Sequence, residues 1–505
     1  MAEDVVESPP AEEQAPYEPH PHRWRILFVS LVIGFMTWLD VTIVNVAIPS
    51  MEHGLDTRAA TVQWVVSGYA LALGLTLVAG GRLGDAYGRR RMMLIGLCGF
   101  VLSSAAVGFA PNVALVIAAR LAQGASAGLL TPQSSGLIQQ LFRGQERARA
   151  FGMYAFTVSV SSASGPVLGG LILALAGEEQ GWRWLFWVNV PIGVVAVAAV
   201  LALVPGRDST KMGDTKARID VRGALLLGGT VIFLLYPVVS IERGALWPLA
   251  LLPLVPLCGW AFLRWERQVA ARDLAPLLDI GLLRRLPSYG NGLGVGALYY
   301  TGYTGLLLVV SVYLQDALDL SPLHTGLLIM PFAAGSAVSA PIAARFVSTE
   351  GRRISVLALA AVMTGVLLVA LLTPGRAPGT VWLVLAPALL IAGLGGGGVN
   401  APNNTLTLSE VPPRMGGAAG GGLQTANRIG ASIGAALLMT AYELARGPVP
   451  AGQALRVAVL VALVFLAAAL LMALQALRQQ NRPPRQQNPE LRQQDAAQSS
   501  SPSPA

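Results

Sequence analysis

The chain has 505 residues, of which 54% are hydrophobic and only 12% are charged. Soluble domains carry about 25% charged residues, so this composition excludes an ordinary water-soluble globular protein. The net charge of +8 does not indicate a nucleic-acid-binding protein, because the basic residues form short clusters between apolar runs instead of one patch. Such clusters are typical of the loops between transmembrane helices.

A transmembrane helix needs about 20 mostly apolar residues. Fourteen segments are predicted to meet this requirement, although 247–263 is short and contains Pro253 and Pro256. We therefore expect an all-α polytopic membrane protein. The segments are 26–49, 61–81, 92–110, 112–141, 150–176, 183–204, 221–240, 247–263, 289–314, 323–347, 353–373, 380–408, 415–441 and 453–477.

Arginine is distributed asymmetrically between the expected loops. If the N-terminus is cytoplasmic, most of the arginine clusters fall in cytoplasmic loops, as the positive-inside rule requires. This pattern predicts an even number of helices with both termini in the cytoplasm. Because Lys211 and Lys216 are the only lysines, a GC-rich bacterial genome is indicated, and we expect the chain in the bacterial plasma (inner) membrane.

An internal repeat divides the chain into two similar parts. The stretch 81–90 recurs in outline at 344–353, with Arg, Gly, Arg and Arg at matching positions. Repeated halves are typical of secondary transporters, which bind substrate between the halves near the membrane midplane. The predicted organisation is an acidic tail (1–22), a six-helix half (23–204), linkers with two inserted helices (205–288), a second six-helix half (289–477) and a polar tail (478–505).

Asp40 is the clearest candidate for chemistry. It lies 15 residues after Arg25, or about 22 Å into the membrane at 1.5 Å per residue. A charged Asp at such depth costs about 2.5–3.5 kcal/mol, so it usually faces a cavity and has a function. Since a carboxyl group removed from water holds its proton more tightly, a proton-binding role is predicted. The alternative is a residue that only fixes helix packing with Thr42 and Asn45.

Two arginines are also expected inside the membrane. Arg120 is predicted about 12 Å from the outer end of its helix, close in depth to Asp40, so both side chains are expected around one cavity. The alternative is an Arg bonded to backbone carbonyls. Arg428, beside Asn427, is predicted about 21 Å deep and is expected to meet an anionic ligand, carbonyl groups or Asp40.

The stretch from Gly81 to Arg91 is expected to be a cytoplasmic loop that turns sharply at its glycines. Asp85 is expected to cap the following helix and to pair with arginines across the interface. Such a cluster holds one side shut and releases it when the halves move. The predicted gate residues are Gly81, Arg82, Gly84, Asp85, Gly88, Arg89 and Arg90.

A second glycine-rich motif lies inside the fifth predicted helix. Its residues, Gly165, Pro166, Gly169 and Gly170, combine a kink with close helix packing. No phosphate-binding Gly-Lys-Ser/Thr sequence, metal-ligand spacing or paired catalytic group is found in the sequence. We expect no enzymatic activity, no metal and no cofactor.

These motifs together resemble the major facilitator superfamily, and within it the fourteen-helix drug:proton antiporters. The stretch 81–90 is similar to the gating motif of loop 2–3, and 120–124 to the helix-four motif whose Arg is linked to proton transfer. The stretch 165–170 is similar to the antiporter motif of helix five, although Ser161 stands where that motif usually begins with Gly. The stretch 39–49 is similar to the helix-one signature of the fourteen-helix branch.

The resemblance implies a proton-driven antiporter that exports small hydrophobic or cationic compounds by alternating access. Protons, a small-molecule substrate and the lipid bilayer are its expected partners, and a monomer is expected. The alternative is a dedicated exporter of one metabolite, such as a self-made antibiotic or an amino acid. An importer, a membrane enzyme and a scaffold are less favoured by the same residues.

Overall fold

The computed structural model describes residues 19–57, 59–177, 180–206, 220–241, 247–272, 283 and 285–480. Most of the two predicted tails and much of the predicted linkers lie outside the described residues. Nearly all of the described chain is helical. Helices are the expected solution for an apolar chain, because lipid offers no hydrogen-bond partner to the backbone.

The first half contains one helix for each of its first five predicted segments. The sixth segment is divided near Val188 into a short and a longer helix that together form one span, Gly181–Leu203. The helices are α1 (Arg23–Gly54), α2 (Ala59–Tyr87), α3 (Arg89–Phe109), α4 (Val113–Leu141), α5 (Gly144–Ala176), α6 (Gly181–Trp187) and α7 (Asn189–Leu203).

Two inserted helices, α8 (Val221–Ile241) and α9 (Leu254–Ala271), precede the second half. The prediction of one helix over 247–263 is wrong: a 3-10 turn occupies Trp247–Leu251, and α9 begins only after Pro253, which cannot donate a backbone hydrogen bond. The second half contains α11 (Pro287–Val312), α12 (Pro322–Glu350), α13 (Arg352–Leu372), α14 (Val381–Thr407), α15 (Gly416–Arg446) and α16 (Ala451–Gln480).

Eleven helices in the described residues are long and apolar enough to cross a membrane. They correspond to predicted segments in both halves, so the all-helical membrane fold is confirmed. The helices α8, α9 and α15 are not among them, although α8 contains a shorter apolar stretch, Arg222–Leu234. The count of fourteen membrane-crossing helices therefore stays a prediction.

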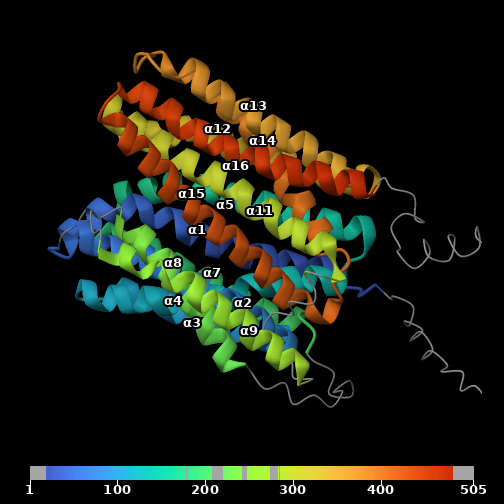
Figure 1. Ribbon diagram of the computed structural model, residues 1–505. Coiled ribbons are helices and arrows are strands. Elements are labelled where there is room, and N and C mark those ends of the chain that lie inside the picture. Colours follow the sequence, from blue (N-terminus) through green and yellow to red (C-terminus); the bar gives the residue numbers. More distant parts are fainter. Residues whose placement is uncertain are drawn as a thin grey trace, which may run out of the picture.

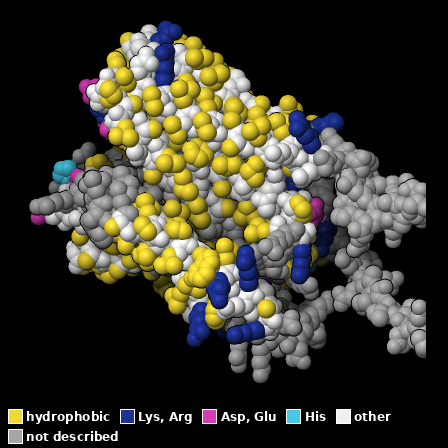
Figure 2. All heavy atoms as spheres, in the orientation of Figure 1, with side chains coloured by type: hydrophobic (Ala, Val, Ile, Leu, Met, Phe, Trp, Pro, Cys, Tyr) yellow, Lys and Arg dark blue, Asp and Glu magenta, His cyan; other side chains and the backbone are white. Residues whose placement is uncertain are grey.

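The two halves lie side by side, with α8 and α9 beside α2 (Figure 1). Helices α1 and α11 begin, and α16 ends, at one end of the bundle, which we call the terminal end; the opposite end is the distal end. Hydrophobic side chains cover the middle of both halves, and many arginines gather at the terminal end (Figure 2). This distribution is the one that a bilayer requires.

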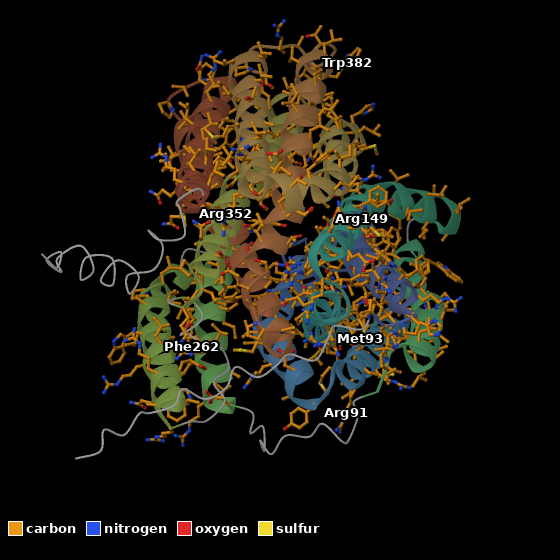
Figure 3. The ribbon with its side chains drawn as sticks, turned by 90° about the vertical axis from the view of Figure 1, so that its right-hand side faces the viewer. Arg91, Met93, Arg149, Phe262, Arg352 and Trp382 are labelled. Atoms are coloured by element: carbon orange, nitrogen blue, oxygen red, sulfur yellow. The ribbon has the colours of Figure 1, made fainter. Side chains whose placement is uncertain are left out.

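The halves are packed together at the terminal end. A buried apolar cluster of the first half continues there into the second half through Tyr289, Leu408 and Ala419. The core of the second half and the distal core of the first half contain residues of one half only. Figure 3 looks onto the terminal end, with Arg91 and Arg149 on the first half and Arg352 on the second. The molecule is thus closed at this end.

Candidate functional site

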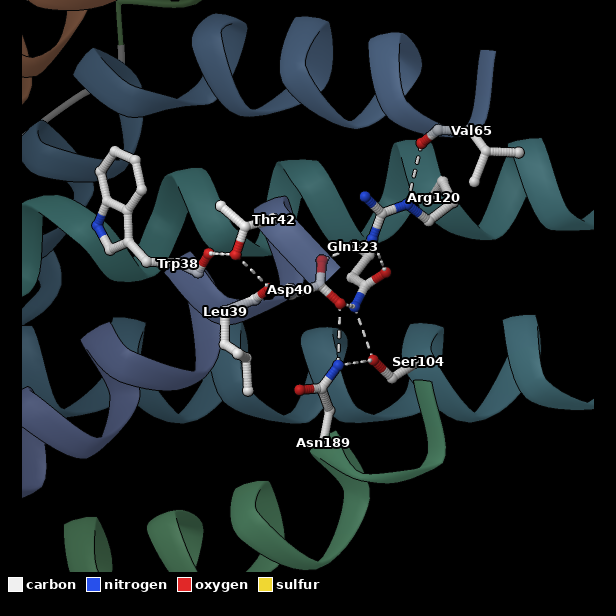
Figure 4. Close-up of polar contacts among 9 residues, drawn as sticks. All are labelled: Trp38, Leu39, Asp40, Thr42, Val65, Ser104, Arg120, Gln123 and Asn189. Carbon is white, nitrogen blue, oxygen red and sulfur yellow. Dashed lines mark hydrogen bonds and ion pairs between the residues drawn. The ribbon is translucent and has the colours of Figure 1, made fainter. Parts of the chain in front are cut away.

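Asp40 lies in a fully buried polar network (Figure 4). Its carboxylate accepts a hydrogen bond from Nη1 of Arg120 at 2.6 Å, which is also an ion pair. It accepts two more from the side-chain amides of Gln123 and Asn189, each at 2.9 Å. All three partners donate to the carboxylate, and an ionised carboxylate only accepts hydrogen bonds, so the network matches a charged Asp40. The network joins α1, α4 and α7.

The partners of Asp40 are themselves held in place. Nε of Arg120 donates to the backbone oxygen of Val65 at 3.0 Å, and its Nη1 donates to Gln123 at 2.8 Å. Ser104 accepts from Gln123 at 2.6 Å and from Asn189 at 3.2 Å. The ring of Tyr69 lies against the guanidinium of Arg120, with 4.2 Å to the ring centroid. Every helix from α1 to α4 therefore contributes to the network.

The structure brings Asp40 and Arg120 together, as their similar depth predicts, but not across a cavity. The two side chains touch and are 0% and 1% exposed, so no substrate or water separates them in this conformation. Gln123 lies in the predicted helix-four motif, whereas Ser104 and Asn189 are site residues that the sequence analysis missed. The signal that was available is a lone amide, Asn189, inside an otherwise apolar segment.

The predicted gate residues join the two halves through Asp85. Its carboxylate accepts hydrogen bonds from the backbone N–H groups of Gly417 at 3.1 Å and Ala418 at 2.8 Å, in the first turn of α15. Arg89 pairs with Asp85 at 2.8 Å and also donates to the backbone oxygen of Pro413 at 3.0 Å. A carboxylate at a helix N-terminus is stabilised by unpaired N–H groups and by the helix dipole.

Two expectations for this region are corrected. Asp85 caps α15 in the other half, not the helix that follows it, and its arginine partner, Arg89, belongs to its own half. The expected loop is one residue long, because α2 continues to Tyr87 and α3 begins at Arg89. Gly88 makes this turn at φ 96°, a conformation that favours glycine.

The remaining gate residues occupy distinct positions. Gly81 touches the backbone of Gly417, and a side chain on Gly84 would collide with Gln133 of α4. Arg90 donates to the backbone oxygen of Leu201 at 2.7 Å, within its own half. Arg82 is partly exposed near Asp85. Of the predicted gate residues, Gly81, Asp85 and Arg89 contact the other half.

Asp85→Ala is expected to favour opening of the terminal end, because hydrogen bonds to a charged group each contribute about 1.5–3 kcal/mol. Spin labels at the exposed positions Arg91 and Thr349, in a variant lacking Cys98 and Cys258, would report longer distances than in the parent protein. Asp85→Asn keeps one acceptor oxygen and should give an intermediate population. Unchanged distances in Asp85→Ala would show that Asp85 does not hold this end closed.

The second glycine motif packs against the part of α1 that lies within two helix turns of Asp40. A side chain on Gly165 would collide with Thr42, and one on Gly169 would lie 3.1 Å from Ile43. Pro166 lies within the continuous helix α5, and Gly170 has open space where a side chain would begin. Close packing is thus found at Gly165 and Gly169 and not at Gly170.

The predicted residues of α15 point in different directions. Arg428 lies over the ring of Trp38 in α1, with 4.8 Å to the ring centroid, and does not contact Asp40. Asn427 is buried against Gly296 of α11. The side chain of Asn45 lies outside the described residues. Trp38 is a contact that the sequence analysis did not anticipate.

Comparison with protein families decides the identity of the fold. Residues 30–435 and 292–501 match the model of the Major Facilitator Superfamily. The chain belongs to the major facilitator superfamily. Members of this superfamily act on small molecules in a membrane, and the relatives described next are bacterial.

Several facilitator relatives are named as exporters or resistance proteins. The chain is 34% identical over 431 residues to the probable actinorhodin transporter of Streptomyces coelicolor, covering 84% of this chain and 73% of the relative. It is 36% identical over 440 residues to the puromycin resistance protein of Streptomyces alboniger, covering 86% and 85%. The tetracenomycin C resistance and export protein of Streptomyces glaucescens is 30% identical over 433 residues, covering 82% and 75%.

Solved structures of other facilitators share the fold. The human organic anion transporter MFSD10 superimposes with a TM-score of 0.68 at 17% identity, covering 90% of this chain and 100% of the other. The proton:xylose symporter XylE gives a TM-score of 0.64 at 14% identity, covering 90% and 95%. At these identities the likeness establishes the architecture alone.

Proposed function

We propose that the chain is a proton-coupled antiporter that exports small, largely hydrophobic organic compounds across the bacterial plasma membrane by alternating access. The buried Asp40–Arg120 pair is the observation that carries this proposal. Asp40 is on α1, a helix that also contacts the second half through Trp38 and Arg428. The names of the relatives, which concern antibiotic transport and resistance, support the direction of transport and the kind of cargo.

Proton binding at Asp40 would change the contacts of α1. A protonated carboxyl group is neutral and donates through its O–H, so it loses the ion pair with Arg120 and no longer matches a network in which all three partners donate. Arg120 keeps its bonds to Val65 and Gln123, which lie outside α1. Protonation therefore loosens α1 from α4, and Trp38, two residues before Asp40, transmits the change to the contact with Arg428.

The gate closes the terminal end in the conformation described here. With both termini in the cytoplasm, as the arginine distribution predicts, this end is the cytoplasmic side. The proton then reaches Asp40 from the outer side, and the compound enters when the contacts of Asp85 with α15 are released. The closed pair of Asp40 and Arg120 has to open during the cycle for the exchange to occur.

Everted membrane vesicles from a pump-deficient host that produces the chain test this proposal. Energised vesicles are expected to accumulate exported compounds from a panel of unrelated antibiotics, and an uncoupler should abolish the accumulation. Accumulation that persists with the uncoupler would contradict proton coupling. Failure to move any compound would contradict export.

A dedicated exporter of one compound is the second candidate. The names of three relatives each specify a single antibiotic, namely actinorhodin, puromycin or tetracenomycin C. Competition in the same vesicles separates the candidates. A multidrug exporter is inhibited by several unrelated compounds, whereas a dedicated exporter is inhibited only by close analogues of its substrate.

A further inference from the structure

A cluster of one arginine and five aromatic residues lies where the two halves meet. Arg428 stacks on Trp38, so one residue comes from α15 in the second half and the other from α1 in the first. Tyr69, Tyr154 and Tyr300 lie within electrostatic range of Arg428, together with Tyr303. We call these six residues the Arg428 cluster. Arg428 is 12 residues into α15, or about 18 Å from its first residue, so the cluster lies near the midplane.

The charge of Arg428 is not neutralised within the part of the chain that the structure describes. No acidic side chain pairs with it there, and no acceptor among these residues bonds its guanidinium. Asp40, the buried acid closest in depth, is already paired with Arg120. Arg428 is partly exposed, so its planar N–H donors remain available to a ligand. An unpaired guanidinium near the membrane midplane favours an anionic partner.

An aromatic wall continues from Arg428 along α11. The rings of Tyr300 and Tyr303 have centroids 5.4 Å apart, and Tyr303 is stacked on Phe332 of α12 at 5.1 Å with an interplanar angle of 8°. Tyr300 and Tyr303 are partly exposed. Tyr300 meets Tyr303 at an interplanar angle of 63°, so a flat ring can pack against this wall edge-to-face or in an offset stack.

One further polar group in the cluster has no partner. The hydroxyl of Tyr69 is buried without a hydrogen-bond partner in the described part of the chain. The same tyrosine stacks on Arg120 and lies within electrostatic range of Asp40 and Arg428. Tyr69 therefore connects Arg428 with the buried pair of Asp40 and Arg120.

We propose that the Arg428 cluster is a substrate subsite for planar aromatic compounds that carry a carboxylate or an acidic hydroxyl group. The guanidinium binds the anion through its N–H donors, and the rings stack on the aromatic body of the compound. This inference rests on the proposed export function and narrows its cargo. It disfavours the cationic compounds that the sequence analysis expects, since Arg428 repels them.

Binding at equilibrium tests the subsite without requiring transport. Dissociation constants of the full-length protein in detergent would be measured for anthracene-9-carboxylate, its methyl ester and (9-anthracenylmethyl)trimethylammonium, which share one ring system. The native protein is expected to bind the carboxylate about tenfold or more tighter than the other two probes. Arg428→Gln should lose this preference while the Kd of the ester changes little.

Two further variants distinguish the subsite from a structural contact between the halves. Arg428→Lys keeps the charge and should keep most of the preference for the carboxylate. Trp38→Leu removes the stacking partner in α1 and should weaken all three probes by a similar factor. If Arg428→Gln weakens the ester as much as the carboxylate, Arg428 is structural and the proposal is wrong.

The remaining outcomes are equally decisive. Native protein that binds the ammonium probe as tightly as the carboxylate, or that binds no carboxylate, contradicts the subsite. If the preference fails while uncoupler-sensitive export in vesicles persists, only the subsite is wrong. If the preference holds but the chain exports nothing, the subsite stands and the proposed function is wrong.

Discussion

Asp40→Asn is expected to abolish uphill export while the protein still inserts into the membrane. The amide has no proton to exchange in the relevant pH range, so accumulation in energised vesicles should fall to the level of vesicles without the protein. The substitution keeps the size of the side chain and one of its two acceptor oxygens. Loss of export with a normal amount of protein in the membrane would thus report on the carboxylate itself.

The same substitution should lower the stability of the protein. Removing one partner of a buried ion pair costs about 3–5 kcal/mol, because the other charge, here on Arg120, is left uncompensated. Asp40→Asn combined with Arg120→Gln removes both charges and should recover most of the loss in thermal stability. We expect neither variant to recover uphill export. Normal export by Asp40→Asn would contradict the assigned role of Asp40.

Gly81→Val is expected to prevent closure of the terminal end. A side chain at this position would collide with the backbone of Gly417 in the other half, and backbone atoms cannot move aside as a flexible side chain can. Because the collision exists only between the halves, the variant should fold and remain trapped with this end open. Spin labels at Arg91 and Thr349 should report long distances alone, and export should fall to background.

Gly326→Val, inside α12 and outside the predicted motifs, is the matched control for this prediction. It makes the same change inside a helix, at a glycine with open space where the side chain begins. Its spin-label distances and export are expected to equal those of the parent protein. If Gly81→Val closes as the parent protein does, the described contact between the halves is not required for closure.

The depth of a residue along its helix could be predicted from the sequence. The direction in which its side chain points around the helix axis could not. Counting residues places Asp40 and Arg120 at similar depths, and the two side chains are in contact. Helices surrounded by lipid have no polar outer face, so periodicity does not indicate which side chains point inward. For this reason Ser104 and Asn189, which complete the network, were missed.

Contacts between the halves were beyond sequence reasoning for a different reason. Asp85 was predicted to cap the helix that follows it, but the helix that it caps begins at Gly416, far along the chain in the other half. A local sequence pattern does not specify such a partner. Arg428 shows the same limit, because its contact with Trp38 joins residues of the two halves.

The prediction of fourteen membrane-crossing helices includes helices in which apolar residues are mixed with glycine-rich or charged stretches. Helix α15 begins with a glycine-rich stretch and contains Arg428, so it falls below the hydropathy of an ordinary span although its length suffices. Helix α9 carries arginines among its apolar residues. Whether such a helix lies in the membrane depends as much on its packing against neighbouring helices as on its hydropathy.

Proton movement driven by the outflow of substrate tests the central claim most directly. Liposomes that contain the purified protein, an exported compound and an internal pH dye are diluted into buffer of equal pH without the compound. We expect the outflow of compound to draw protons inward and acidify the interior with the parent protein, and no acidification with Asp40→Asn. Acidification by Asp40→Asn at the rate of the parent protein would contradict the account.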